Sequence, residues 1–526
     1  MSSDQEREPE PVSHAPGEPI GPSTTPLHQN SNPTALSINT HPESTTHLRP
    51  SRESPAQPET PSRSPRPSFK AVGLLPVAIR RMMKPQKKLA EAPTYLSSLR
   101  AIVTETYLSI LLVFIPIGWA LHFHKRDNYP AVFVTNFLAI VPLAKLLGFA
   151  TEELALRVGQ TIGGLLNATF GNAVELIVAI VALTKCELRV VQSSLIGSIL
   201  SNLLLVLGMC FFAGGTRYSE QGFMASAAQL NSSLLTISVI AVLLPAAFHF
   251  ATNQQVDPDE GLDILRMSHG VAIVLLFIYA GYLFFQLWSH AHLYDEGEHA
   301  GFAEPSTAYP KGGRTIKGIA MSAIRRKKID EEQPVEAAEP MEKEEEVEVP
   351  KLNVVSAVGL LVVVTVLVAF TAEYLVDSID GLTNTGSISK EFVGLILLPI
   401  VGNAAEHVTA VTVSVKDKLD LSIGVAVGSS IQIALFVIPL LVVIAWGMGK
   451  PLTMLNDPFE SVVLFLSVLV VNYVVSDGKS NWLEGFILMM LYVIIAVAFW
   501  YYPGSNPLAD LGNSINLGGC SLEAAG

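Results

Sequence analysis

Eleven long apolar runs, separated by short polar turns, dominate the chain between residues 106 and 502. A helix rises 1.5 Å per residue, so most of these runs can cross the ~30 Å hydrocarbon core of a bilayer. Only helices and closed barrels satisfy their backbone in lipid, and runs this continuously apolar exclude barrel strands. We therefore expect an all-α polytopic membrane protein with about eleven transmembrane helices. The runs are 106–123, 131–154, 162–184, 191–213, 225–250, 262–290, 352–378, 391–415, 420–446, 458–476 and 482–502.

The polar residues are concentrated outside these runs. Only 15% of the 526 residues are charged, well below the ~25% of a soluble domain. Residues 1–100 are rich in Pro, Ser, Thr and Glu and are predicted to be a disordered tail. A basic cluster at 80–88 precedes the first run, which favours a cytosolic N-terminus. With eleven spans, the short tail 504–526 then lies on the lumenal side.

A second polar segment, 291–351, divides the apolar runs into six and five. It carries basic residues and ends in an acidic run, 330–349, and the predicted topology makes it cytosolic. The acidic run is either a solvated face or an element that regulates transport by sensing cations, and the N-terminal tail is a second candidate for regulation. Much of the net charge of −13 comes from this run, and no pattern indicates a nucleic-acid partner.

The three cysteines are Cys186, Cys210 and Cys520. They are too few and too scattered to indicate a disulfide framework or a metal site, so we interpret them as apolar filler.

An internal repeat relates the two halves of the chain. The word Gly-Asn-Ala-x-Glu occurs at 171–175 and again at 402–406, in the runs 162–184 and 391–415. A shift of 231 positions also pairs 197–198 with 428–429, and a shift of 221 pairs 149–152 with 370–373. The two words are five spans apart, so their helices cross in opposite directions. This predicts two inverted five-helix repeats, 131–290 and 352–503, with the first helix (101–130) peripheral.

The repeated word carries the candidate chemistry. Residues i and i+3 share a helix face, so Asn172 points with Glu175 and Asn403 with Glu406. A carboxylate at bilayer depth costs at least ~2.5–3.5 kcal/mol and is a functional candidate by default. Neither run contains a Lys or Arg to pair with it. Carboxylate and amide oxygens suit Ca²⁺, which takes 6–8 oxygen ligands. The remaining candidate ligands are Ser198, Ser429 and Gln432.

Protons compete for the same carboxylates. Two neighbouring desolvated carboxylates hold either a divalent cation or protons, which is enough to couple Ca²⁺ movement to H⁺ movement through Glu175 and Glu406. His407 either relays protons or is a packed helix histidine. Glu152 and Glu373 occupy equivalent places near helix ends, where they either line a cation entrance or only extend to the interface.

The segments 171–176, 197–208 and 402–407, together with the start of the last run, resemble the calcium/proton exchanger family (CAX type) of the Ca²⁺/cation antiporter superfamily. The resemblance covers roughly 100–503. It implies eleven helices, exchange of cytosolic Ca²⁺ for H⁺ from an acidic lumen, and a vacuolar membrane. It also implies Ca²⁺ ligation centred on Glu175 and Glu406, with help from Asn172, Asn403, Ser429 and Gln432.

Three alternatives remain beside this interpretation. A Na⁺-coupled Ca²⁺ exchanger would have a proline before each glutamate, which neither repeat has, and a broader Mn²⁺/H⁺ exchanger would use the same ligands. An intramembrane hydrolase would need H-E-x-x-H or G-x-S-x-G in a span, so we expect no enzyme and no cofactor. A channel is less consistent with inverted repeats, and a homo-oligomer is compatible with the sequence.

Overall fold

The computed structural model describes residues 89–105, 107–125, 127–158, 160–252, 260–290, 305–309, 349–384, 388–505 and 520. The chain separates into Met1–Phe69 and Lys70–Gly526, and every element below belongs to the second unit. Most of the predicted tail, the basic cluster and the acidic run 330–349 lie outside the described residues. Residues 95–100, which we assigned to the tail, form the start of a helix.

The first half contains the helices that precede the polar segment. Their bounds are α2 Tyr95–Thr104, η1 Tyr107–Val113, α3 Phe114–His124, α4 Tyr129–Ala155, α5 Gln160–Phe170, α6 Ala173–Thr184, α7 Leu188–Leu200, η2 Ser201–Val206, α8 Leu207–Gly215, α9 Ala225–Thr252, α10 Glu260–Phe284 and η3 Phe285–Ser289. Here η1 is a 3₁₀ helix, whereas η2 and η3 are π-helical turns that continue α7 and α10.

The second half contains the helices that follow the polar segment. Its helices are α12 Val354–Asp377, α13 Ile379–Thr383, α14 Lys390–Phe392, η6 Val393–Leu397, α15 Leu398–Gly402, α16 Ala404–Ser414, α17 Leu419–Gln432, η7 Ile433–Val437, α18 Ile438–Gly447, α19 Pro458–Val474 and α20 Trp482–Tyr501. Within the described residues, eight helices are long and apolar enough to cross a membrane, or ten when each of two bent pairs counts as one span. The apolar helix α19, with 17 residues, is shorter than these spans.

Polar caps and apolar outer faces explain where these helices begin and what surrounds them. Asn353 caps α12 by accepting from Ser356 N at 2.8 Å, and Asn481 forms a capping box at the start of α20. The outer face of α12 presents valines, among them Val355 and Val362, that are more than half exposed. In water such a face would be unfavourable, but in a bilayer it contacts lipid. The protein is therefore a polytopic membrane protein.

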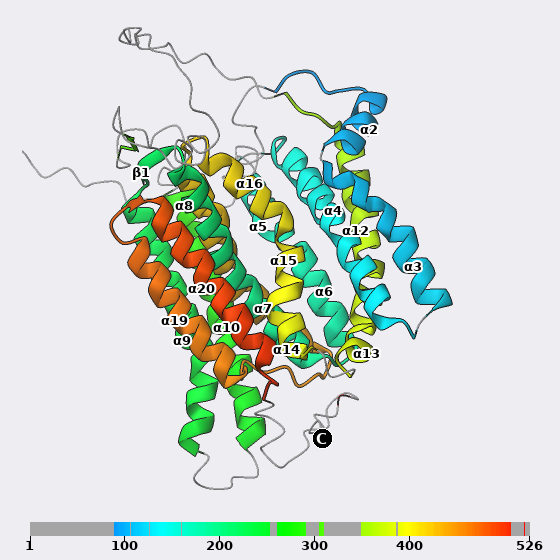
Figure 1. Cartoon of the computed structure of the whole chain (residues 1–526), viewed down its shortest axis with the longest axis vertical. Coiled ribbons are helices and arrows are strands. Elements are labelled where there is room, and N and C mark those ends of the chain that lie inside the picture. Colours follow the sequence, from blue (N-terminus) through cyan, green and yellow to red (C-terminus); the bar gives the residue numbers. More distant parts are fainter. Residues whose placement is uncertain are drawn as a thin grey trace, which may run out of the picture. The chain divides into compact units, whose positions relative to one another are not determined.

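The bundle has a buried centre and a peripheral first helix. In the most apolar stretch of each span, 11% of the residues are buried in the first span, formed by η1 and α3. The corresponding shares are 83% in the span α7–α8 and 67% in the span α17–α18. α4 packs against α12, and α3 lies outside α4 (Figure 1). The span formed by η1 and α3 is therefore less buried than the central spans of the bundle.

We name the two ends of the bundle by the elements found there. The β1 end is where α4, α8 and α16 finish and the strand β1 lies; the α14 end is where α6 finishes and α7, α14 and α19 begin (Figure 1). A three-stranded antiparallel sheet, in the order β2-β1-β3, stands at the β1 end. Its strands are β1 Tyr218–Gly222, β2 Thr307–Ala308 and β3 Lys479–Ser480.

This small sheet was not predicted from the sequence. Its middle strand pairs Tyr218 with Ala308 and Gln221 with Ser480, so the segment between the repeats is joined to both halves. Asp417 anchors it, accepting from Ser306 Oγ at 2.8 Å and from Gln221 Nε2 at 3.0 Å. Strands of two residues carry no alternating apolar pattern, so a pattern-based prediction misses them.

The interpretation of the cysteines as filler is wrong for two of the three. Cys186 and Cys520 form a disulfide with their Cα atoms 5.5 Å apart, whereas Cys210 is free and buried. The partners are separated by 334 residues, and only the fold brings Cys520 to the turn between α6 and α7. Spacing along the chain therefore could not indicate the pairing.

Two repeat-equivalent glycines differ in their surroundings. A Cβ built on Gly197 of α7 would lie 2.2 Å from the Leu395 carbonyl oxygen and 2.6 Å from Pro399 Cγ. Only a glycine allows α7 to approach η6 and α15 this closely. A Cβ built on Gly428, the equivalent residue of α17, would meet nothing within 4 Å. The two halves share a sequence pattern but differ in packing.

We predict that Gly197→Ala destabilises the folded protein by about 1–3 kcal/mol, because the added methyl group must displace backbone rather than a flexible side chain. Gly428→Ala is the matched control and is expected to leave the stability of this state unchanged. Thermal unfolding of both variants in detergent measures the difference. Equal melting temperatures for the two variants would contradict the close helix crossing.

Candidate functional site

Each Gly-Asn-Ala-x-Glu word interrupts a membrane helix. The axes of the helices on either side differ by 43° at the α5–α6 break and by 60° at the α15–α16 break. Asn172 (φ −101°, ψ 21°) and Asn403 (φ −88°, ψ 2°) leave the helical conformation there. Each glutamate stands in the first turn of the helix that restarts, where a negative charge is favoured. Each break also frees carbonyl groups at the end of the preceding helix.

Asn172 joins the first break to α17. Its Nδ2 donates to Gln432 Oε1 at 2.7 Å, and its Oδ1 accepts from Ser429 Oγ at 3.0 Å. Ser429 Oγ also accepts from Asn202 Nδ2 at 3.2 Å. Glu406 lies close enough to Asn202 and Ser429 to interact with both. The structure thus brings together four of the predicted residues, Asn172, Ser429, Gln432 and Glu406.

Asn403 joins the second break to α7. It is fully buried, and its Nδ2 donates to the Ser198 carbonyl oxygen at 3.5 Å. A Cβ built on Gly402 would lie 2.6 Å from Glu175 Oε1, so this glycine makes room for the carboxylate. This second cluster, Asn403, Ser198 and Glu175, is the repeat counterpart of the first.

The two carboxylates have unused acceptor capacity. Glu175 Oε2 and Glu406 Oε2 are buried atoms without a hydrogen-bond partner among the described residues, as are the Oδ1 atoms of Asn202 and Asn403. The described ion pairs include neither glutamate. Buried polar atoms normally have partners, so this set is suited to bind an ion. In the described part of the chain, no group of three or more His, Cys, Asp or Glu could hold a metal, so amide, hydroxyl and carbonyl oxygens must contribute.

A cavity of about 860 Å³ leads from the β1 end to this site. Its wall includes Gly402, Glu406, Ser429 and Gln432 at the level of the helix breaks. Asp417 and Asp420, together with Ser306 of the sheet-forming segment, line it nearer the β1 end. Glu175 lines a separate cavity of about 30 Å³ with Ser194 and Ser198. That volume accommodates one or two waters. The site is therefore open toward the β1 end in this conformation.

Comparisons with known proteins agree with this architecture. A family model described as "Sodium/calcium exchanger protein" matches residues 128–288 and 356–501. The chain belongs to the sodium/calcium exchanger protein family. The two matched segments correspond to the two halves of the bundle on either side of the polar segment.

Three relatives have informative names. The chain is 54% identical over 485 residues to a vacuolar calcium ion transporter of Cryptococcus neoformans var. grubii, covering 82% of this chain and 79% of the relative. It is 44% identical over 393 residues to a Ca²⁺/H⁺ antiporter of Aphanothece halophytica, covering 75% and 96%. The solved structure of native YfkE is 30% identical, with a TM-score of 0.56, covering 75% of this chain and all of the other.

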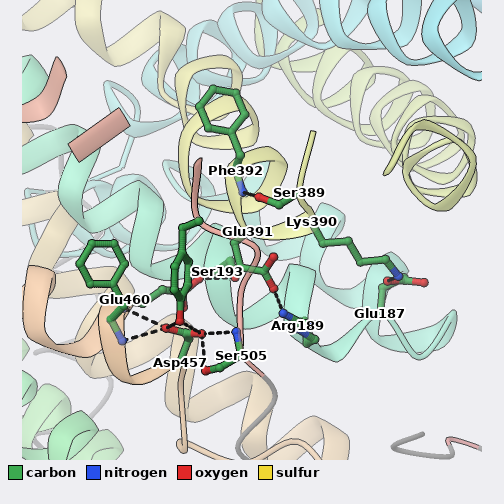
Figure 2. A network of polar contacts seen from close by, with 12 residues as sticks. Glu187, Arg189, Ser193, Ser389, Lys390, Glu391, Phe392, Asp457, Glu460 and Ser505 are labelled. Carbon is green, nitrogen blue, oxygen red and sulfur yellow. Dashed lines mark hydrogen bonds and ion pairs between the residues drawn. The ribbon is translucent and has the colours of Figure 1, made fainter. Parts of the chain in front are cut away.

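The α14 end of this exchanger-family protein is closed by polar contacts (Figure 2). Arg189 of α7 pairs with Glu391 of α14, and Ser193 Oγ donates to Glu460 Oε1 of α19 at 2.5 Å. Asp457 caps α19 and also accepts from Ser505 N at 2.8 Å, which holds the segment after α20. These contacts tie three helix starts together on the side of the site opposite the large cavity.

A second group of ion pairs lies at the same end. Lys390 Nζ lies 2.9 Å from Glu187 Oε2 and also pairs with Asp380. Lys185 Nζ lies 3.0 Å from Asp377 Oδ1 and 3.5 Å from Glu373 Oε1. The hydrogen bond to Asp377 raises the pKa of Lys185, whereas burial raises the pKa of Glu187.

The remaining predicted residues are dispersed. Glu152 lines the large cavity, but Glu373 lies at the α14 end beside Lys185. His407 follows Glu406 on α16, where consecutive side chains do not face each other, and its buried Nε2 has no partner among the described residues. Sequence reasoning missed Asn202 and Lys145. Asn202 occupies the π-helical turn η2, and Lys145 lines the cavity from the middle of α4.

We predict that Arg189→Met destabilises the protein by about 3–5 kcal/mol, because Glu391, only 2% exposed, would lose its cationic partner. The double variant Arg189→Met/Glu391→Met should regain most of that loss. Arg266→Met is the control: the side chains of its pair with Asp263 are 73% and 49% exposed, so at most ~1 kcal/mol is at stake. Thermal unfolding reports all three, and equal effects of Arg189→Met and Arg266→Met would contradict the assignment.

Proposed function

We propose that this protein is a secondary active antiporter that exchanges cytosolic Ca²⁺ for H⁺ from an acidic lumen. The observation that carries this proposal is the convergence of two broken helices, each bearing an asparagine and a glutamate, on a site that a cavity reaches from one end. The names of the relatives, a vacuolar calcium ion transporter and a Ca²⁺/H⁺ antiporter, support the choice of ions.

The site offers the ligands that Ca²⁺ prefers. We assign the carboxylates of Glu175 and Glu406 as the central ligands. Unpartnered amide oxygens and carbonyl groups at the breaks support an oxygen shell of the size Ca²⁺ needs. The other proposed ligands are Asn172, Asn403, Ser198, Ser429 and Gln432.

Proton coupling follows from the same two carboxylates. Without a cation, two buried carboxylates near each other are stabilised by taking up protons, because desolvation and mutual repulsion disfavour their charged forms. A divalent cation and protons therefore exclude each other at Glu175 and Glu406, which couples their movements. His407 is proposed to pass protons to or from this site, because its Nε2 is buried and has no hydrogen-bond partner among the described residues.

The unequal packing of the two repeats supports alternating access. The helix crossing at Gly197 is closed, whereas the space around Gly428 is open, and the two breaks bend by 43° and 60°. In an inverted repeat, exchange of the two conformations between the halves turns the site toward the opposite side. Glu152, in the open cavity, is then a proposed cation entrance, and Glu373 its counterpart in the other state.

We assign the β1 end to the cytosol and the α14 end to the vacuolar lumen. Disulfides persist in oxidising compartments, and the Cys186–Cys520 bond joins the α14 end to the C-terminal tail. The basic cluster at 80–88 favours a cytosolic N-terminus, which agrees. Regulation by the acidic run or the N-terminal tail, assembly into a homo-oligomer and transport of Mn²⁺ are further proposals that come from the sequence alone.

We expect Glu175→Gln and Glu406→Gln each to reduce proton-driven ⁴⁵Ca²⁺ uptake by at least ~100-fold, because each removes a charge that only a cation or a proton neutralises. The measurement uses sealed vesicles with an acid interior. Glu484→Gln is the matched control, since glutamine can also complete the capping box at Asn481. Retention of uptake by either site variant would refute the assignment.

The same vesicles decide the counter-ion. A protonophore should abolish uptake, and a Na⁺ gradient imposed without a pH gradient should not restore it. Uptake driven by Na⁺ alone would favour the sodium-coupled exchanger and contradict the proposed coupling to protons.

The proposed orientation predicts where the disulfide reacts. In sealed vacuoles with the cytosolic face outward, a membrane-impermeant reductant should leave Cys186–Cys520 intact, and it should reduce the bond after permeabilisation. Thiol labelling followed by mass analysis of the peptides checks this. Reduction in sealed vacuoles would reverse the assignment of the two ends.

A further inference from the structure

A lysine lies in the membrane-spanning part of the cavity that leads to the two glutamates. Lys145 is ten residues from the end of α4 at Ala155, which is about 15 Å along a helix and therefore half the thickness of the hydrocarbon core. Ionisable residues at this depth are costly and mark functional sites by default. Lys145 carries no role in the exchange chemistry described above.

The α4 side chains around Lys145 form one face of the cavity wall. Lys145, Gly148 and Glu152 follow one another at spacings of three and four residues, so they share a helix face, and all three line the cavity. α4 packs directly against α15 and α16, which carry the second break. The ammonium group and the Glu406 carboxylate thus border the same space. By the same count, Glu406 is about 12 Å from the end of α16, at a similar depth.

The charge of Lys145 is not neutralised by a close ion pair. Among the described residues, no carboxylate oxygen is recorded within 4.0 Å of its Nζ, although its charge interacts with that of Glu152 two turns away. The equivalent position in the second repeat, 221 residues later, is Val366. The second repeat therefore has no lysine at the equivalent position.

We propose that Lys145 sets the affinity of the open cavity for divalent cations by electrostatic repulsion. This inference rests on the proposed function in taking Ca²⁺ as the ion. A doubly charged ion experiences twice the repulsion of a monovalent one at the same distance, so Lys145 disfavours Ca²⁺ more than H⁺. The ammonium group keeps Ca²⁺ binding at Glu406 weak enough for the ion to leave as well as to enter. Lys145 acts on the site through its field and is not a ligand.

The test is a charge series at one position. Lys145→Met and Lys145→Gln remove the charge with little change in length, and Lys145→Arg retains it. We expect both neutral variants to lower the KM for Ca²⁺ by about 3- to 30-fold, with the maximal rate unchanged or lower, and Lys145→Arg to match the parent protein. The KM for Mn²⁺ should change by the same factor, because the effect depends on charge and not on fit.

Lys416→Met is the matched control. It removes the charge of a lysine at the β1 end, from an exposed residue outside the cavity wall, and should leave KM unchanged. Unchanged or raised KM in both neutral variants, loss of affinity in Lys145→Arg, or an equal shift in Lys416→Met would overturn the inference.

Equilibrium binding of ⁴⁵Ca²⁺ to the purified full-length variants separates this inference from the proposed coupling. Tighter binding by Lys145→Met supports the role of the lysine even if vesicles show no proton-driven uptake. If the parent protein binds no Ca²⁺ at all, the inference and the proposed function both fail. If it binds and exchanges Ca²⁺ but the neutral variants bind no more tightly, only the role of Lys145 fails.

Discussion

The structure depends on one constraint: backbone and charged groups inside a bilayer must find partners without bulk water. Both Gly-Asn-Ala-x-Glu motifs leave polar groups without helical partners, because each ends one helix and begins another at membrane depth. The asparagines supply some of the missing contacts: Asn172 contacts Ser429 and Gln432, and Asn403 contacts the Ser198 carbonyl group. What they leave unsatisfied, chiefly the carboxylate oxygens, is the basis of the proposed affinity of the site for positive charge.

The repetition of this motif made the fold predictable from sequence. Apolar runs of transmembrane length follow directly from hydropathy, and a word shared at a fixed offset identifies repeats whose relative direction can be counted. The same offset explains why Asn172 meets Ser429 and Gln432 while Asn403 meets Ser198, because an inverted repeat pairs each break with the other half. These long-range contacts could be predicted only because the motif involved occurs twice in the sequence.

Features that occur only once in the chain could not be predicted in this way. Lys145, Asn202 and the Cys186–Cys520 pair lack repeat counterparts, and nothing along the chain relates them to their neighbours in space. The sheet of β1, β2 and β3 joins segments almost 90 and more than 250 residues apart through very few residue pairs. The unequal packing at Gly197 and Gly428 is also invisible to sequence, since both positions carry the same amino acid.

The small sheet has a consequence for the segment that connects the repeats. Strand β2 lies in that segment, yet it is joined to β1 of the first repeat, and β1 is joined to β3 of the second. Ser306, just before β2, lines the cavity and donates to Asp417 in the turn between α16 and α17. The segment that connects the repeats therefore contributes one strand, β2, to the sheet at the mouth of the cavity. A substitution at Ser306 would therefore alter both the wall of the cavity and the contact that holds β2 in place, although this residue lies in the segment between the repeats.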